Sequence, residues 1–191
     1  DITINSTSTG GVGLGPTISR GTGVDDEGDG SNIGVNALVS SIRLNNVNAF
    51  NRLTLNAATR LDSGTLTSGG DASFTAATLM DINSAVVGGS LTANSNVFMT
   101  GEAGISVGQD FLVNLSRIGT TNTGFQNRGP IAVGRDFTVQ SSGSINIQGG
   151  GGPLTIGRNF TINNVSNDPA ANSIFFISTL NVGGNASLES D

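Results

Sequence analysis

Apolar and polar residues alternate with a period of two in short segments that recur along most of this chain. The shared pattern is apolar, any residue, Val or Ile, Gly, any residue, Asp or Asn, apolar, Thr, apolar. Six copies begin at Leu66, Ala85, Ile105, Ile131, Leu154 and Leu180, and a seventh covers 47–55 with Phe50 in place of the glycine. The anchor positions are Phe50, Gly69, Gly88, Gly108, Gly134, Gly157 and Gly183, and the intervals between them lengthen towards the C-terminus.

Each copy predicts two short strands that meet at a corner. Ile105 and Val107 alternate before the glycine, and Phe111 and Val113 alternate after it, which is the period of a strand with one buried face. The glycine permits a bend that a side chain would obstruct. A third, weaker strand is expected between copies, at 79–82, 97–99, 144–147 and 174–177.

Three short strands that recur at these intervals describe one coil of a solenoid. We therefore predict an all-β chain folded as a right-handed parallel β-helix of about seven to eight coils, with three short strands in each coil. Residues 1–191 form a single domain in this interpretation. Within it, residues 1–41 make irregular N-terminal coils with an acidic loop at 24–33, and the regular repeats occupy 42–190.

A polar residue follows two positions after each anchor: Arg52, Asp71, Ser90, Asp110, Asp136, Asn159 and Asn185. In-register stacking places these side chains above one another, which predicts a polar ladder bonded to backbone amides or between side chains. Only Asp110 and Asp136 are adjacent acids, so a row of carboxylates that binds cations is disfavoured.

Composition narrows the available chemistry. The 191 residues contain no Cys, His, Trp or Tyr, every cation is an arginine, and the net charge is −6. That charge argues against electrostatic binding to nucleic acid or to an anionic membrane, and no apolar run is long enough to span a bilayer. Imidazole and thiol catalysis are excluded, and the one plausible carboxylate pair, Asp110 and Asp136 beside Arg135, is already explained by the corner ladder. We therefore expect no catalytic residues and no enzymatic activity.

Acidic residues alternate at Asp25, Glu27 and Asp29 and are followed by Gly30, in partial agreement with a calcium-binding loop. Asn36 stands where the bidentate glutamate of such a loop belongs, so the site is incomplete. We expect no cofactor, and calcium at these three acids remains open beside a solvated acidic loop.

Later coils carry additional residues at 120–130, 148–153 and 163–172. The first two precede the same type of strand, so we expect them to protrude from the same corner, where insertions in solenoids often build a binding face. The alternatives are tolerated surface loops, or a carbohydrate-binding or carbohydrate-processing β-helix that uses 120–130 and 148–153. Ice binding is disfavoured, because each coil presents one outward Thr or Ser and Leu112 interrupts the row.

The segments G-G-S-L-T-A-N at 88–94, G-R-D-F-T-V-Q at 134–140 and G-R-N-F-T-I-N at 157–163 resemble the repeats of filamentous-haemagglutinin-type exoproteins. The resemblance covers about 42–190. It implies a protein exported by two-partner secretion to the bacterial cell surface or extracellular space, as an adhesin, a biofilm or matrix component, or a shaft that presents a toxin. That family's N-terminal secretion domain has no counterpart in these residues.

Both ends of the chain resemble fragments of a repeat. Ile2 and Ile4 form a ready strand, and the last copy includes Leu180, Val182 and Leu188. Open solenoid ends expose unpaired strand edges. We therefore expect either self-association end to end into a filament or continuation in a longer chain, with a surface glycan or another cell-surface ligand as a further partner.

Overall fold

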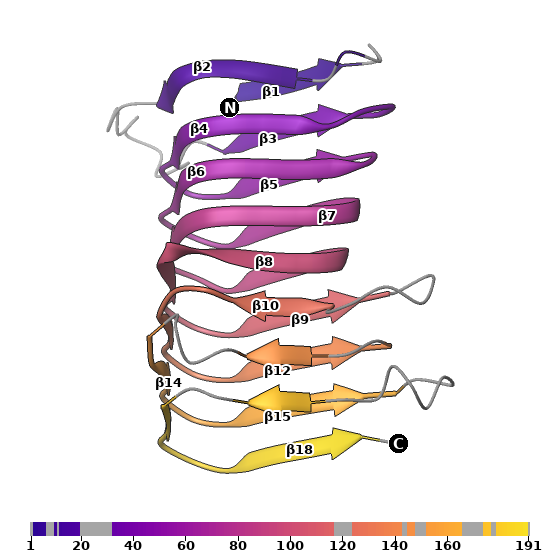
Figure 1. Ribbon diagram of the computed structural model, residues 1–191. Helices are drawn as coiled ribbons and strands as arrows, with labels where there is room; N and C mark the ends of the chain where they lie inside the picture. Colours follow the sequence, from indigo (N-terminus) through magenta and orange to yellow (C-terminus); the bar gives the residue numbers. More distant parts are fainter. Residues whose placement is uncertain are drawn as a thin grey trace.

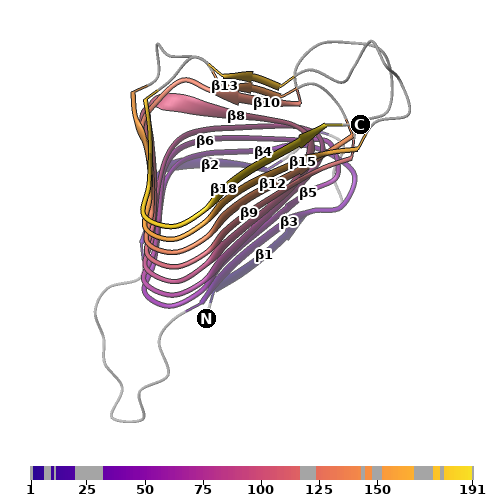
Figure 2. The same cartoon turned by 90° about the horizontal axis from the view of Figure 1, so that it is seen from below.

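The computed structural model describes residues 2–6, 10, 12–19, 32–116, 124–142, 145–147, 152–165, 174–176 and 179–190. The described elements are all β-strands, and they pair in parallel as the chain winds into a rod of triangular cross-section (Figures 1 and 2). In Figure 2 the chain turns anticlockwise as it approaches the viewer, so the coil is right-handed. The predicted parallel β-helix is confirmed, and the number of coils is close to the seven to eight expected.

One face of the rod, called face A, carries the strands that follow each anchor position. From the N-terminus it consists of β1 (Ile2–Ser6), β3 (Ile33–Ala37), β5 (Leu53–Ala57), the beginning of β7 (Ala72–Val87), the beginning of β8 (Leu91–Val107), β9 (Phe111–Leu115), β12 (Phe137–Ser141), β15 (Phe160–Asn164) and β18 (Ala186–Ser190). These strands stack without a change of register from one coil to the next.

The other two faces share several long, bent strands. Face B contains the beginnings of β2 (Val12–Ser19), β4 (Ile42–Ala49) and β6 (Arg60–Ser68), the middle of β7 and β8, β10 (Phe125–Asn127), β13 (Ile145–Ile147) and β16 (Ile174–Phe176). Face C contains the ends of β2, β4, β6, β7 and β8, then β11 (Ile131–Val133), β14 (Leu154–Ile156) and β17 (Leu180–Val182). The weaker third strand of each coil, expected from short apolar patches, is therefore present as face B.

The inward residue at every second strand position builds one continuous core. In β9 the burial alternates along Phe111–Leu115, as period-two sequence alternation requires. The rings of Phe111 and Phe137 stack with centroids 4.8 Å apart, and Phe160 follows at 5.4 Å from Phe137. Burying each of these side chains contributes roughly 2 to 3 kcal/mol, so the stacked column is a main source of stability in the later coils.

The glycine corner, defined as the three residues that join a face C strand to the next face A strand, explains the anchor glycines. A Cβ atom on Gly134 would lie 2.1 Å from the carbonyl oxygen of Gly108, and one on Gly157 would lie 2.1 Å from that of Gly134. Positive φ angles occur in the described residues at Gly104 and Gly152, not at the anchors. The anchor glycines are therefore required by the close approach of stacked coils rather than by an unusual bend.

The predicted placement of the two insertions at one corner is only partly right. Strand β10 lies inside 120–130, and its Phe125 is fully buried in the core. The residues between β9 and β10 connect face A to face B, whereas those between β13 and β14 connect face B to face C. Segments 120–130 and 148–153 therefore share the corner between faces B and C only through residues 128–130. The strand was missed because Phe125 is the single apolar residue of its three-residue segment.

Candidate functional site

The predicted corner ladder is confirmed as a series of side chains that accept hydrogen bonds from the backbone of the next coil. The Ser90 amide donates to Asp71 Oδ1 at 2.9 Å, and the Asp136 amide donates to Asp110 Oδ1 at 3.2 Å. The same contact continues from the Asn159 amide to Asp136 and from the Asn185 amide to Asn159, at 3.1 and 3.2 Å. Five of the seven corner residues thus satisfy a backbone donor at the bend, namely Asp71, Ser90, Asp110, Asp136 and Asn159.

Two arginines reinforce this ladder in the later coils. Arg135 Nε lies 3.5 Å from Asp110 Oδ1, and Arg158 donates from Nε to Asp136 Oδ1 at 3.1 Å and from a terminal nitrogen to the other oxygen. The hydrogen bond from Arg158 is the main reason that the pKa of Asp136 falls from 3.8 to about 2; partial desolvation opposes it, and the Asn159 amide assists. Both acids of the pair singled out by sequence are therefore engaged as corner acceptors, and Asp136 is ionised at neutral pH.

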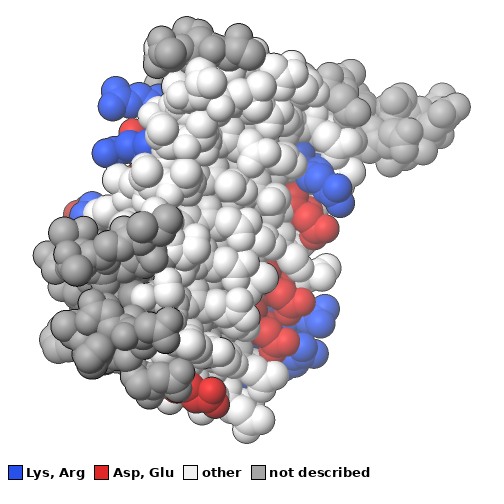
Figure 3. All heavy atoms as spheres, turned by 90° about the vertical axis from the view of Figure 1, so that its right-hand side faces the viewer, with Lys and Arg blue, Asp and Glu red and all other residues white. Residues whose placement is uncertain are grey.

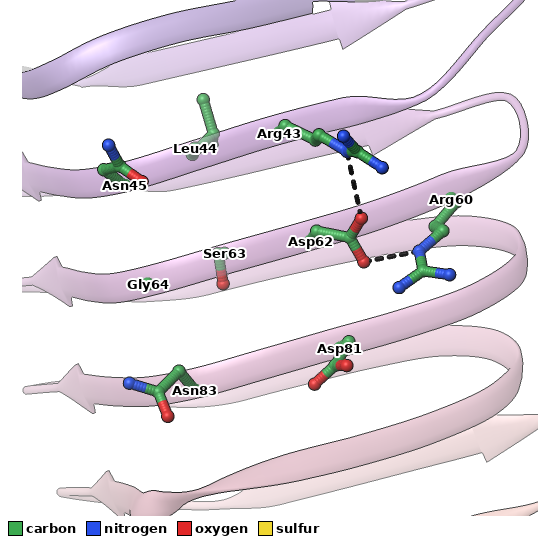
Figure 4. A pocket seen from close by; sticks show the side chains of 9 residues that line it. All are labelled: Arg43, Leu44, Asn45, Arg60, Asp62, Ser63, Gly64, Asp81 and Asn83. Carbon is green, nitrogen blue, oxygen red and sulfur yellow. Dashed lines mark hydrogen bonds and ion pairs between the residues drawn. The ribbon is translucent and has the colours of Figure 1, made fainter.

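A second charged cluster lies on face B of the earlier coils, in an open hollow of about 440 Å³ (Figure 4). Arg43, Asp62 and Asp81 stand in register on three successive coils. Asp62 is paired with Arg60 at 2.5 Å and with Arg43 at 3.4 Å. The Arg43 side chain is 78% exposed. Exposed pairs of this kind contribute at most about 1 kcal/mol.

Sequence reasoning missed this face B cluster although a signal was present. Positions 43, 62 and 81 are equally spaced, at the same interval that separates the anchors Phe50, Gly69 and Gly88 of the tight coils. The repeat was aligned on the glycine corner and the strands beside it, so charged residues on the opposite face were left unaligned.

Face A presents two outward rows of uncharged polar side chains. The first is the predicted Thr or Ser row, now seen as Thr3, Thr54, Ser73, Thr92, Thr138, Thr161 and Ser187, with Gly34 and Leu112 in the same register. The second row, two residues further along each strand, is Asn5, Asn36, Asn56, Thr75, Asn94, Asn114, Gln140, Asn163 and, as its one charged member, Glu189. Figure 3 shows an uncharged band along the rod between two charged edges.

The second row, called the amide row, is partly linked along the rod. Asn36 Nδ2 donates to Asn5 Oδ1 at 2.8 Å, and Asn114 Nδ2 donates to Asn94 Oδ1 at 2.9 Å. Such ladders of identical amides are favoured where parallel strands stack in register. The row was missed because it falls just beyond the nine-residue repeat, although a polar residue two positions after the outward Thr would have indicated it.

The residues proposed for assembly lie at the two ends of the rod. Ile4, Leu180 and Val182 are partly buried against the core, and Leu188 is 48% exposed. Ile2 begins β1, which pairs with β3, and β18 pairs with β15. Ile2 and Ile4 lie at one end of the rod, and Leu180, Val182 and Leu188 lie at the other. The two sets therefore do not meet within one chain, and they would come together only if two rods stacked end to end.

The proposed calcium ligands Asp25, Glu27 and Asp29 lie between β2 and β3, outside the described residues. Within the described ranges, no three potential Asp, Glu, His or Cys ligands gather closely enough to hold a metal ion. In the same ranges there is no helix long and apolar enough to cross a bilayer.

No family model, curated protein or solved structure matches this chain. The likeness to haemagglutinin-type repeats therefore rests on the repeat segments themselves.

Proposed function

We propose that this chain is a shaft segment of an extracellular structural or adhesive protein, acting in cell-surface adhesion or in a matrix. The observation that carries the proposal is the repetition of one corner and one core along the whole rod. Each added coil supplies the same backbone hydrogen bonds and covers the same apolar positions, so the rod can be lengthened by repeating the same coil. The extracellular location rests on the resemblance of the repeats to those of secreted exoproteins.

The last described coil leaves apolar side chains that a further parallel coil would cover. Leu188 is in register with Ile162, and Leu180 is in register with Leu154. Ile162 and Leu154 are fully buried, whereas Leu188 is 48% exposed and Leu180 is only partly buried. A further parallel coil over this surface would bury the remaining apolar area and pair the outer edge of β18. In the filament form of the proposal, β1 of a second copy supplies that coil.

Negative-stain electron microscopy of the purified chain over a concentration series, with and without calcium, tests the filament form of this proposal. We expect fibres one solenoid wide whose length increases with concentration. Leu188→Asp places a charge in the end surface and should stop elongation, whereas Val86→Asp, at an exposed position on the side of the rod, should not. Short rods of the same length for the wild type and both variants would exclude self-stacking.

A further inference from the structure

A groove of about 450 Å³ lies at the edge of face A in the later coils, where the chain turns towards face B. Its walls come from three successive coils and include Asn114, Gln140 and Asn163 of the amide row, together with Ser116 and Val165. Because consecutive coils are about 4.8 Å apart, the groove offers three similar groups at regular intervals along the rod.

The amide groups in the groove have unused hydrogen-bonding capacity. Asn114 Nδ2 donates to Asn94, which orients the Asn114 Oδ1 atom, and that oxygen is buried without a donor in the described part of the chain. Gln140 and Asn163 are the next two members in register, and the side chains of neither form a hydrogen bond with described residues. Because the Asn114 oxygen is shielded from solvent, a ligand in the groove would instead bond to the more accessible amide groups of Gln140 and Asn163.

The chemistry of the walls defines a narrow class of ligand. Carboxamides both donate and accept hydrogen bonds, which suits a molecule with many hydroxyl groups. Val165 is 54% exposed at the edge of the groove and offers an apolar surface for the C–H face of a ring. The described groove residues carry no charge, and the one charged member of the amide row, Glu189, is in register with Asn163 one coil further on.

We propose that this groove binds a neutral oligosaccharide lengthwise, with its sugar units along the rod and its hydroxyl groups on Gln140 and Asn163. A peptide strand is a poorer fit, because strand addition needs an open sheet edge and the backbone of these coils is paired with coils above and below. The groove lies on the side of the rod, so the proposal does not depend on end-to-end stacking. It also differs from a carbohydrate site built on 120–130 and 148–153.

A glycan array that carries neutral and anionic oligosaccharides, followed by calorimetric titration of the strongest neutral binder, tests the groove. We expect a dissociation constant of about 1 mM or tighter. Gln140→Ala and Asn163→Ala should each weaken binding about threefold to tenfold, the loss expected for one or two neutral hydrogen bonds. Asn56→Ala is the matched control, because Asn56 belongs to the same amide row but lies outside the groove.

Thermal unfolding of each variant separates loss of binding from loss of structure. Gln140 is exposed, so Gln140→Ala should unfold at nearly the wild-type temperature. The proposal is overturned if no neutral oligosaccharide binds at about 1 mM or tighter, or if anionic glycans bind in preference to neutral ones. It is equally overturned if Gln140→Ala binds like the wild type, or if Asn56→Ala weakens binding as much as the groove variants do.

Discussion

The earlier and later coils enclose the same kind of core with different numbers of residues per coil. In the earlier coils the sequence separation of stacked corner residues is 19 or 20, and single strands such as β7 and β8 run through all three faces. From β9 onward that separation is 23 or 26, and each coil has three separate short strands. The core changes as well, from mostly aliphatic residues to a column of phenylalanines.

The difference shows which corner the fold holds constant. From β4 onward, the chain spends three residues at every glycine corner, whereas the additional residues of later coils fall between faces A and B or between faces B and C. At the glycine corner, successive amides donate to the coil before, as Gly134 does to Val107 at 2.8 Å and Arg135 to Gln109 at 3.0 Å. An insertion there would break these contacts together, so length variation is confined to the other two corners.

The largest expected effect tests whether the phenylalanine column stabilises the later core more than the aliphatic residues stabilise the earlier core. Phe137 has ring neighbours at 4.8, 5.4 and 6.2 Å, whereas Phe74 is in register with Leu55 and Ala93. Both side chains are fully buried. Phe137→Ala should lower the free energy of unfolding by about 3 to 5 kcal/mol. Phe74→Ala should cost about 1 kcal/mol less, because it loses no ring–ring contacts with described residues.

Urea denaturation followed by circular dichroism measures both free energies, and Thr138→Ala serves as the control because Thr138 is the outward neighbour of Phe137. That control should change the free energy of unfolding by less than about 0.5 kcal/mol. Equal costs for the two phenylalanines, or a larger cost at Phe74, would mean that the aromatic column adds nothing beyond burial.

Sequence reasoning recovered the parts of this fold that repeat strongly, and it failed where the repeat is weak. The inward pairs and the anchor glycines recur in nearly every copy, so they predicted the solenoid and its corner ladder. Strand β10 depends on one buried apolar side chain, Phe125, and its neighbours carry no alternation of apolar residues. The groove is formed where the ends of three face A strands meet the next corner. The order of apolar and polar residues along the sequence does not show how these strand ends are arranged in space. Positions 43, 62 and 81 were recoverable from the period of the tight coils alone.

An intermediate effect tests whether the glycine corner must keep its length of three residues. Two extra glycines placed directly after Gly134 should lower the free energy of unfolding by about 3 kcal/mol, because three neighbouring hydrogen bonds of about 1 kcal/mol each are lost. The same two glycines placed directly after Ser116, between faces A and B, should cost under about 1 kcal/mol, as loop lengthening is inexpensive. Thermal and urea unfolding of the two insertion variants compare these costs. Equal tolerance at both positions would show that the corner keeps its length for another reason.

The smallest expected effect concerns the arginine pairs that appear in the ladder of the later coils. The pKa of Asp136 is lowered from 3.8 to about 2 in the folded chain, chiefly by the hydrogen bond from Arg158. Because the folded value is the lower one, the unfolded chain binds the proton more readily in this range. The stabilisation is therefore complete above the ordinary value of 3.8 and is lost as the pH falls through about 2.

Two variants separate this titration from general acid unfolding. Asp136→Asn keeps an acceptor for the Asn159 amide but removes the ionisable group, so its melting temperature should fall less than that of the wild type as the pH is lowered from neutral to about 2. Arg158→Gln keeps Asp136 but removes its main partner, so the carboxyl carbon shift of Asp136, followed by nuclear magnetic resonance, should titrate closer to 3.8. A wild-type titration of Asp136 at its ordinary pKa would show that the exposed guanidinium is screened by water. In that case the arginine pairs add no stability to the later coils beyond that of the backbone ladder, which the earlier coils also have.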